Sequence, residues 1–541
     1  MKKIFNLTIN EIIKESSKIP FLILCGFLIL FSVLTPIVYK NTYRFSRYEH
    51  TLNGGNWNLG YLTLIKNPGF FEQNITEEQK QTDEYKKFME VKQEIKNVAN
   101  QYKNLVVISS SYRNEFYREL IEKTITHYIY SLYLENPLYK NNRMIYEYYN
   151  MYLDKGCLEK DDAYFQERKE ELNREIQYLN DVVVNNDYNK YFDYMVYKTK
   201  KDIEKANTNT ELTTNEISCV MNLSDMREVN VYMLEIYEEL AKKDIKGYES
   251  EYIINYLFDI KKYSVYAFSP ISDNGYSSKY KNLEEYHKVV KQSQKRFLQE
   301  SDKLKYAVIN DIDYQKSGIR DAIQQILSNI KYVSIFVLLI SCGMVTREFD
   351  KGSIRLLITK PSKRWKVMLS KILAIIFYSF IFTFVYVSLA FLTSIIIYGT
   401  KDLAIPMIEY GSEVYTTNYL IYILKYTLLN VPSLIFLGTL SLCLSVLFRN
   451  TVFPMLSSIA LLFLSGIFIG LMDFIYIPFA KILFLPHLNL YNLMTFPFIE
   501  ELEFVSKASL SLSGSIINLL VHSIIFSFIT ILVFNKKDIE N

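Results

Sequence analysis

The sequence contains few of the residues that carry metal, redox or nucleophilic chemistry. Only 5 of its 541 residues are cysteine, and only 5 are histidine. It has no Cys-x-x-Cys or His-Glu-x-x-His motif, and it has no Gly-x-x-x-x-Gly-Lys-Ser/Thr loop for phosphate. We therefore expect no catalytic residues, no metal ligands and no cofactor bound by this chain, and we predict that it is not an enzyme.

The sequence also has little excess of either charge. Lys and Arg number 61 and Asp and Glu number 58, so the net charge of +3 gives no overall basic surface for nucleic acid. Hydrophobic residues make up 50% of the chain, which is too many for a disordered protein. The mean hydropathy of +0.03 is that of an ordinary soluble protein, but an average conceals how apolar residues are distributed.

Apolar residues are concentrated in six runs, each close to the roughly 20 residues that a helix needs to cross a bilayer. Between the first two runs, residues 40–325 are polar, with 41 Lys and Arg against 45 Asp and Glu. We predict an all-α membrane protein with six transmembrane helices and a large, mostly helical extracellular domain between the first two. The predicted spans are residues 19–39, 326–346, 372–398, 418–448, 451–472 and 513–534.

Basic residues in the short segments between spans predict the orientation, because such segments remain in the cytoplasm. With six spans, every strongly basic segment falls on the same side of the membrane. Both termini are then cytoplasmic and residues 40–325 are outside. The basic segments are the amino-terminal tail (Lys2, Lys3, Lys14 and Lys18), the loop of residues 347–371, Arg449, and the pair Lys536 and Lys537.

Three features outside the basic loops leave alternatives open. Lys425 lies within the fourth predicted span, where it either extends to the interface or contacts a substrate or ion. The 45 tyrosines either pack in a helical core or form an aromatic lining that holds an amphipathic ligand. Cys157 and Cys219 lie in the predicted outer domain, where a disulfide is permitted but not required.

Residues 278–329 predict one long helix that continues into the second span.

The loop of residues 347–371 has the pattern of a short amphipathic helix. Gly352 and Ser353 are able to start the helix, an apolar stretch follows at residues 354–358, and Pro361 ends it. A helix of this kind, projecting from a membrane domain, either lies on the bilayer or docks into a groove of a partner protein.

This loop resembles that of the permease subunits of type 2 ABC exporters, the ABC-2 family. In that family the second span is followed by Glu-x-x-x-Gly-Thr/Ser, an apolar stretch, a proline, a basic residue, and Lys-x-x-Ala at the start of the third span. The matching residues here are Glu348, Gly352, Ser353, residues 354–359, Pro361, Arg364, Lys371 and Ala374. The resemblance extends to an amphipathic "elbow" helix in residues 1–18, with Ile4, Phe5, Ile9, Ile12 and Ile13 on its apolar face, and to a re-entrant segment before the last span.

The resemblance implies the permease subunit of an ATP-driven exporter in the bacterial plasma membrane. Such a subunit pairs with a second permease, identical or different, and with separate ABC ATPase subunits that bind ATP and Mg. The residues implied in ATPase coupling are Glu348, Phe349, Gly352, Ser353, Ile354, Arg355, Leu356, Leu357, Pro361 and Arg364.

The insertion at residues 40–325 departs from the simple members of that family. It favours an amphipathic substrate such as a peptide, an antimicrobial or a lipid, consistent with a role in antimicrobial peptide resistance. We expect contact with membrane lipid and none with nucleic acid. The alternative is a membrane-anchored surface scaffold or receptor without transport activity, in which the basic loop only binds lipid headgroups.

Overall fold

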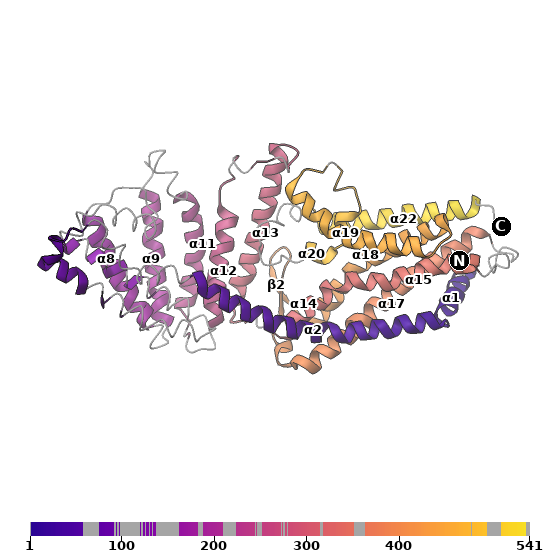
Figure 1. Ribbon diagram of the computed structural model, residues 1–541, viewed down its shortest axis with the longest axis horizontal. Helices are drawn as coiled ribbons and strands as arrows, with labels where there is room; N and C mark the ends of the chain where they lie inside the picture. Colours follow the sequence, from indigo (N-terminus) through magenta and orange to yellow (C-terminus); the bar gives the residue numbers. More distant parts are fainter. Residues whose placement is uncertain are drawn as a thin grey trace. The chain divides into compact units, whose positions relative to one another are not determined.

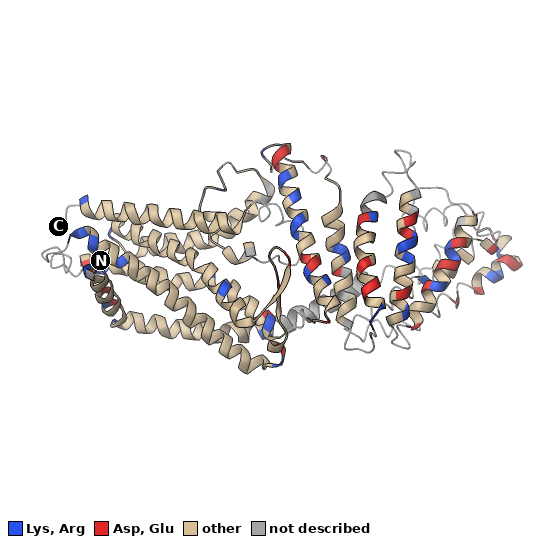
Figure 2. Ribbon diagram, turned by 180° about the vertical axis from the view of Figure 1, so that it is seen from behind, with Lys and Arg blue, Asp and Glu red and all other residues tan. Residues whose placement is uncertain are grey.

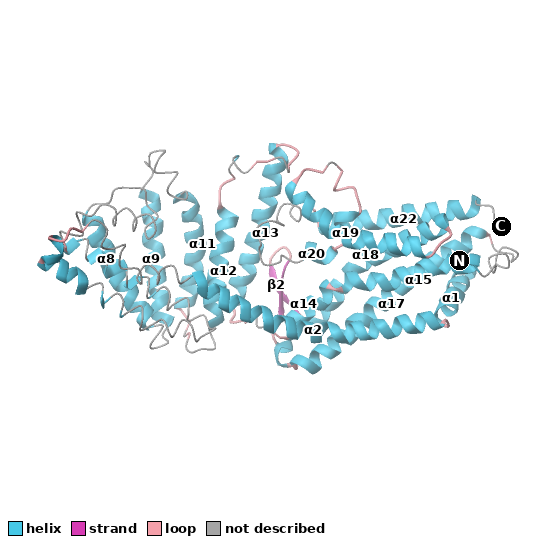
Figure 3. Ribbon diagram, viewed as in Figure 1, coloured by secondary structure: helices cyan, strands magenta, loops and turns pink. Residues whose placement is uncertain are grey.

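The computed structural model describes most of the chain, and the fold is mostly helical (Figure 3). The described residues are 2–57, 75–90, 162–181, 188–208, 223–243, 251–271, 280–313, 318–350, 363–477, 479–494 and 510–536, with isolated positions between 93 and 136 and at 245, 273, 276 and 277. The chain divides into two units. The membrane unit comprises Met1–Tyr43, Ile271–Arg296 and Tyr314–Asn541, and the polar unit comprises Arg44–Pro270 and Phe297–Asp313.

The membrane unit is built from long apolar helices (Figure 1). Within the described residues, six helices are long and apolar enough to cross a membrane, as predicted. These segments are Ile19–Lys40, Ile319–Phe349, Arg364–Tyr398, Tyr419–Phe448, Val452–Met472 and Leu512–Lys536. The corresponding helices are α2 (Ile19–Trp57), α14 (Ile319–Ser328) with α15 (Ile330–Asp350), α17 (Arg364–Tyr398), α18 (Tyr419–Phe448), α19 (Val452–Phe474) and α22 (Leu512–Lys536).

Shorter elements complete the membrane unit. A separate helix, α1 (Lys2–Ser16), precedes α2. The connection between α19 and α22 contains a 3-10 turn, η8 (Leu485–His487), and the short helix α20 (Leu490–Met494). A second 3-10 turn, η7 (Lys401–Ala404), follows α17.

Helix α18 is central to the membrane unit and packs against α15, α17, α19 and α22. Helix α18 approaches its neighbours closely at Gly438. A Cβ atom at that position would lie 2.6 Å from Ile375 Cγ2 on α17 and 3.0 Å from Val337 Cγ1 on α15. The absence of a side chain therefore allows three spans to meet, as small residues commonly do between membrane helices.

Two local features differ from the sequence-based expectations. The prediction of one continuous helix over residues 278–329 is wrong, because α13 (Leu283–Ile309) ends before Asp311, whose φ is 55°, and α14 begins only after Gly318. The segment between α17 and α18 also contains an antiparallel hairpin that was not predicted. Its strands are β1 (Met407–Tyr410) and β2 (Val414–Thr417), with Met407 opposite Thr417.

Charged residues are frequent along the helices of the polar unit and sparse along the long helices of the membrane unit (Figure 2). Helices α8 (Asp162–Asn180), α9 (Tyr188–Thr208), α11 (Leu223–Ala241) and α12 (Glu251–Phe268) pack in that order, each against the next. The carboxyl-terminal part of α13 also belongs to this unit. Cys157 and Cys219 lie outside the described residues, so their pairing stays open.

Candidate functional site

A buried ion-pair network joins three helices at one end of the membrane unit. At its centre is Lys371 on α17, whose side chain is 0% exposed. Its Nζ donates to Glu11 Oε2 on α1 at 2.7 Å, to Glu348 Oε1 on α15 at 2.8 Å, and to the Met344 carbonyl at 3.1 Å. All three donors of one ammonium group are thus directed at oxygen atoms from two other helices.

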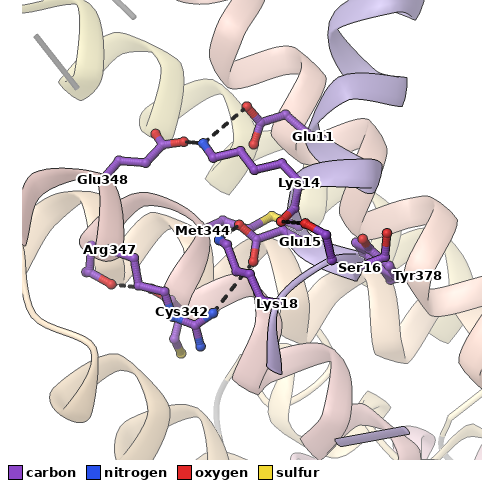
Figure 4. A network of polar contacts seen from close by, with 12 residues as sticks. Glu11, Lys14, Glu15, Ser16, Lys18, Cys342, Met344, Arg347, Glu348 and Tyr378 are labelled. Carbon is purple, nitrogen blue, oxygen red and sulfur yellow. Dashed lines mark hydrogen bonds and ion pairs between the residues drawn. The ribbon is translucent and has the colours of Figure 1, made fainter. Parts of the chain in front are cut away.

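Further charges surround this centre (Figure 4). The Nζ of Lys14, on α1, also donates to Glu348 Oε1 and lies 3.8 Å from Glu11 Oε1. One turn further along α1, Glu15 pairs with Lys18 and lies 3.6 Å from Arg347 Nη1 of α15. The network therefore contains three carboxylates and four cations, contributed by α1, α15, α17 and the residues that follow α1.

Helical periodicity explains how α1 contributes two carboxylates. Glu11 and Glu15 are four residues apart, so they lie on the same face of the helix, and both are buried. The predicted apolar face is divided: Ile12 packs against the core, whereas Phe5, Ile9 and Ile13 are exposed. Helix α1 therefore directs its acidic side into the protein and an apolar stripe outward.

A backbone contact also holds α1 in place. The hydroxyl of Tyr378, two turns after Lys371 on α17, donates to the Ile12 carbonyl at 2.9 Å. Buried ion pairs repay their loss of hydration only when the geometry is good and the remaining hydrogen bonds are made. The Lys371 ammonium group makes all three of its hydrogen bonds, so the network is expected to fix the relative positions of α1, α15 and α17.

The structure places three of the ten predicted coupling residues. Glu348 lies inside the network and is 3% exposed. The Arg449 guanidinium lies over the ring of Phe349, 5.2 Å from the centre of that ring. Arg364 begins α17, and its Nη1 lies 3.5 Å from the Asn535 carbonyl on α22. The other seven predicted residues, Gly352, Ser353, Ile354, Arg355, Leu356, Leu357 and Pro361, lie outside the described residues.

These contacts bring the predicted basic segments together. Helix α1, the end of α15, the start of α17, Arg449 after α18, and the end of α22 all lie at the same end of the membrane unit (Figure 1). The pattern of Lys and Arg along the sequence thus corresponds to one physical end of the helical bundle.

Two more charges are bound within the membrane unit away from the network. Arg320 on α14 is buried and donates through Nε to Tyr419 Oη at 3.1 Å and through Nη2 to the Pro406 carbonyl at 2.7 Å. For Lys425 the sequence left open whether the side chain extends to the interface or contacts a substrate or ion. In the structure it pairs with Glu409 of β1 at 2.7 Å, and its side chain is 42% exposed. The unpredicted hairpin therefore supplies the partner of the charge in the fourth span.

Sequence reasoning identified Glu348 and Lys371 but missed Glu11, Glu15 and Arg320. For Glu11 and Glu15 the available signal was the pair of acidic residues four apart in an amphipathic helix, a spacing that puts both on one side. Within the described ranges, no group of three His, Cys, Asp or Glu side chains is placed to hold a metal ion.

Comparisons with known proteins support membrane location without assigning a function. Residues 289–540, which include Glu348 and Lys371 but not Glu11, match the model of a family described as a protein of unknown function, DUF2705. Two relatives come from Bacillus subtilis (strain 168). The uncharacterized protein YhcI is 23% identical over 210 residues, which cover 38% of this chain and 64% of YhcI. The uncharacterized membrane protein YdbK is 30% identical over 135 residues, which cover 25% of this chain and 51% of YdbK.

The chain thus spans less than two thirds of the length of either relative. No solved structure matches it. Six apolar helices and the likeness to a membrane protein together make this chain a multi-pass membrane protein.

Proposed function

We propose that this chain is the membrane-spanning permease subunit of an ATP-driven ABC exporter. The observation that carries the proposal is the fully buried Lys371, which ties α1 to the ends of α15 and α17. Those two helix ends flank residues 351–362, the segment whose sequence resembles a coupling helix. A movement of the docked ATPase would therefore be transmitted through this segment to two spans and to the amino-terminal helix, which buried ion pairs hold together.

In this proposal the chain performs no bond chemistry. Separate ABC ATPase subunits bind ATP and Mg and dock against residues 351–362. A second permease, identical or different, completes the pathway in the bacterial plasma membrane, with both termini in the cytoplasm and residues 40–325 outside. The substrate is an amphipathic peptide, antimicrobial or lipid, and the large polar unit receives or shields it beyond the membrane.

The proposal is tested by co-purification. The tagged chain is expressed together with the reading frames that flank its gene and is purified in detergent. We expect a protein with a phosphate loop to co-purify and to hydrolyse ATP. Leu357→Pro should release that protein, because proline beyond the first turn of the expected helix removes a backbone hydrogen bond and disrupts the helix. Lys363→Met, at an exposed position of the same loop, should retain it.

A second variant separates docking from coupling. Glu348→Gln should leave the ATPase bound but change the rate of ATP hydrolysis in proteoliposomes, because it weakens the contacts with Lys371 without altering the docking segment. If no ATPase co-purifies, or if Leu357→Pro retains it, the transport proposal fails and the scaffold or receptor alternative is favoured.

A further inference from the structure

The polar unit contains a partly open cavity, lined mainly by α8, α9, α11 and α12. Its volume is about 150 Å³, which is the size of a cavity that accommodates a molecule such as benzene. One part of the wall is aromatic and apolar, and includes Tyr178, Tyr237, Met233 and Leu257. The rings of Tyr178 and Tyr194 stack with centroids 4.8 Å apart, which gives that wall a flat and rigid portion.

An adjoining part of the wall is charged and centres on Glu175, which is 1% exposed. Its Oε1 accepts from Tyr194 Oη at 2.6 Å, from Lys198 Nζ at 2.9 Å and from Arg168 Nη1 at 3.4 Å. Its Oε2 accepts from Lys123 Nζ at 2.5 Å. A single carboxylate therefore meets three cations and a phenol at the edge of the cavity.

These contacts determine the protonation of the wall. Burial would raise the pKa of Glu175, but Lys198, Lys123 and Arg168 outweigh it and hold that pKa well below its usual range. Burial and the charge of Glu175 raise the pKa of Tyr194, so its hydroxyl remains a donor. The carboxylate stays ionised at neutral pH, and the cations beside it exceed it in charge.

The residues that line the cavity carry a net positive charge. Three are lysines, at positions 123, 198 and 261, and two are acidic, Glu175 and Asp202. Lys198 is one third exposed, with a side chain at 32%, and an ammonium group has three donors, of which Glu175 takes one. An apolar body would thus occupy the aromatic side while an anionic group approached Lys198.

We propose that this cavity is a binding site for a small monoanionic amphipathic molecule, a carboxylate on a single aromatic ring or a short branched chain. The ring or chain lies against the tyrosine and methionine side, and the carboxylate accepts a hydrogen bond from Lys198. The inference concerns the polar unit alone and does not depend on the transport proposal.

The test compares three probes of the same shape and different charge. Fluorine NMR of the full chain in detergent is recorded with 4-fluorobenzoate, 4-fluorobenzyl alcohol and 4-fluorobenzylamine. We expect saturable broadening of the benzoate signal, reversed by unlabelled benzoate, and no saturable broadening for the amine. The alcohol should bind at least about tenfold more weakly than the acid, as expected when a charge-assisted hydrogen bond is lost.

Two variants on α9 make a matched pair. Lys198→Met removes the proposed anion contact, whereas Lys200→Met removes a lysine that is 54% exposed and pairs with Glu238. Benzoate affinity should fall at least about tenfold in the first and stay unchanged in the second. The assignment is overturned if benzoate shows no saturable binding, if the amine binds as tightly as the acid, or if Lys198→Met retains the affinity.

Discussion

Replacing Lys371 with methionine tests whether the buried network holds the membrane unit together. Methionine has a similar length and no charge, so the change removes the cation while leaving most of the packing. Glu11 and Glu348, 8% and 4% exposed, would then remain buried without their central partner. Lys14 would be left as their nearest shared cation.

The size of the effect follows from opposing terms. At 2.8 Å and an effective dielectric constant of about 20, each lysine–carboxylate contact provides about 6 kcal/mol of attraction. Loss of hydration costs several kcal/mol for each of the three ions, so the intact network is close to neutral in its net contribution. Removal of the lysine leaves the carboxylates with their hydration cost and without the attraction. We therefore expect the free energy of unfolding to fall by about 3–5 kcal/mol.

This loss converts into a thermal shift. The membrane unit contains about 300 residues, for which an unfolding entropy of about 2.1 cal/mol/K per residue gives roughly 0.6 kcal/mol/K. The midpoint of thermal unfolding, followed by far-UV circular dichroism in detergent, should therefore fall by about 5–8 °C. Lys363→Met, at an exposed position just before α17, should shift it by less than about 1 °C.

A combined variant distinguishes charge from packing. If buried carboxylates cause the loss, the triple variant Glu11→Gln, Glu348→Gln and Lys371→Met should recover at least half of it, because no unpartnered carboxylate of the central trio remains. An equal shift for Lys371→Met and Lys363→Met would refute the reasoning. A triple variant less stable than Lys371→Met alone would show that packing, not charge, sets the cost.

Three other changes test separate parts of the structure by the same thermal assay. Gly438→Ala should cost about 1–3 kcal/mol through overpacking, whereas Gly466→Ala, with no atom within 4 Å of the added Cβ, should not destabilise; equal effects would contradict the close approach at Gly438. Lys425→Met should cost less than about 1 kcal/mol, because its pair with Glu409 is partly exposed, and a larger loss would mean that the pair is desolvated. Burial lowers the pKa of His487 below 6.5. Its contribution to the free energy of unfolding should therefore be complete above about pH 6.5 and decline as the pH falls. His487→Gln should flatten that decline, and an unchanged pH profile would exclude His487 as its source.

Much of the fold is predictable from the sequence because the bilayer imposes a length on each apolar run. That constraint identified six spans, which the structure confirms. This length constraint does not apply to segments that lie outside the hydrocarbon core of the bilayer. The break at residues 310–318 contains no proline, and its Asp311 adopts a left-handed conformation that a polar residue tolerates but no pattern requires. The hairpin strands have four residues each, too few for alternation to be visible.

The candidate site was predictable only in part, for a different reason. The sequence motif identified Glu348 and Lys371 individually, but it did not show that they contact each other. Glu11 lies 360 residues from Lys371 in the sequence, and no periodicity relates positions that far apart. A buried charge can be recognised in advance by its presence in an apolar segment, whereas its partner is determined by the tertiary fold.

The distribution of side chains in α17 supplies an argument for the membrane that hydropathy alone does not. Ser379, Thr383 and Ser394 are each 0% exposed, whereas Phe384 and Ile396 are exposed, Ile396 to 83%. A soluble protein would place these residues the other way round, because burial of large apolar groups drives its folding. Lipid removes that drive, so small polar residues occupy helix contacts and large apolar ones face outward. Helix α1 shows the same inversion with full charges, because Glu11 and Glu15 are buried whereas Phe5, Ile9 and Ile13 are exposed. The network around Lys371 therefore attaches α1 to the spans together with Ile12, which packs against the core and whose carbonyl accepts from Tyr378.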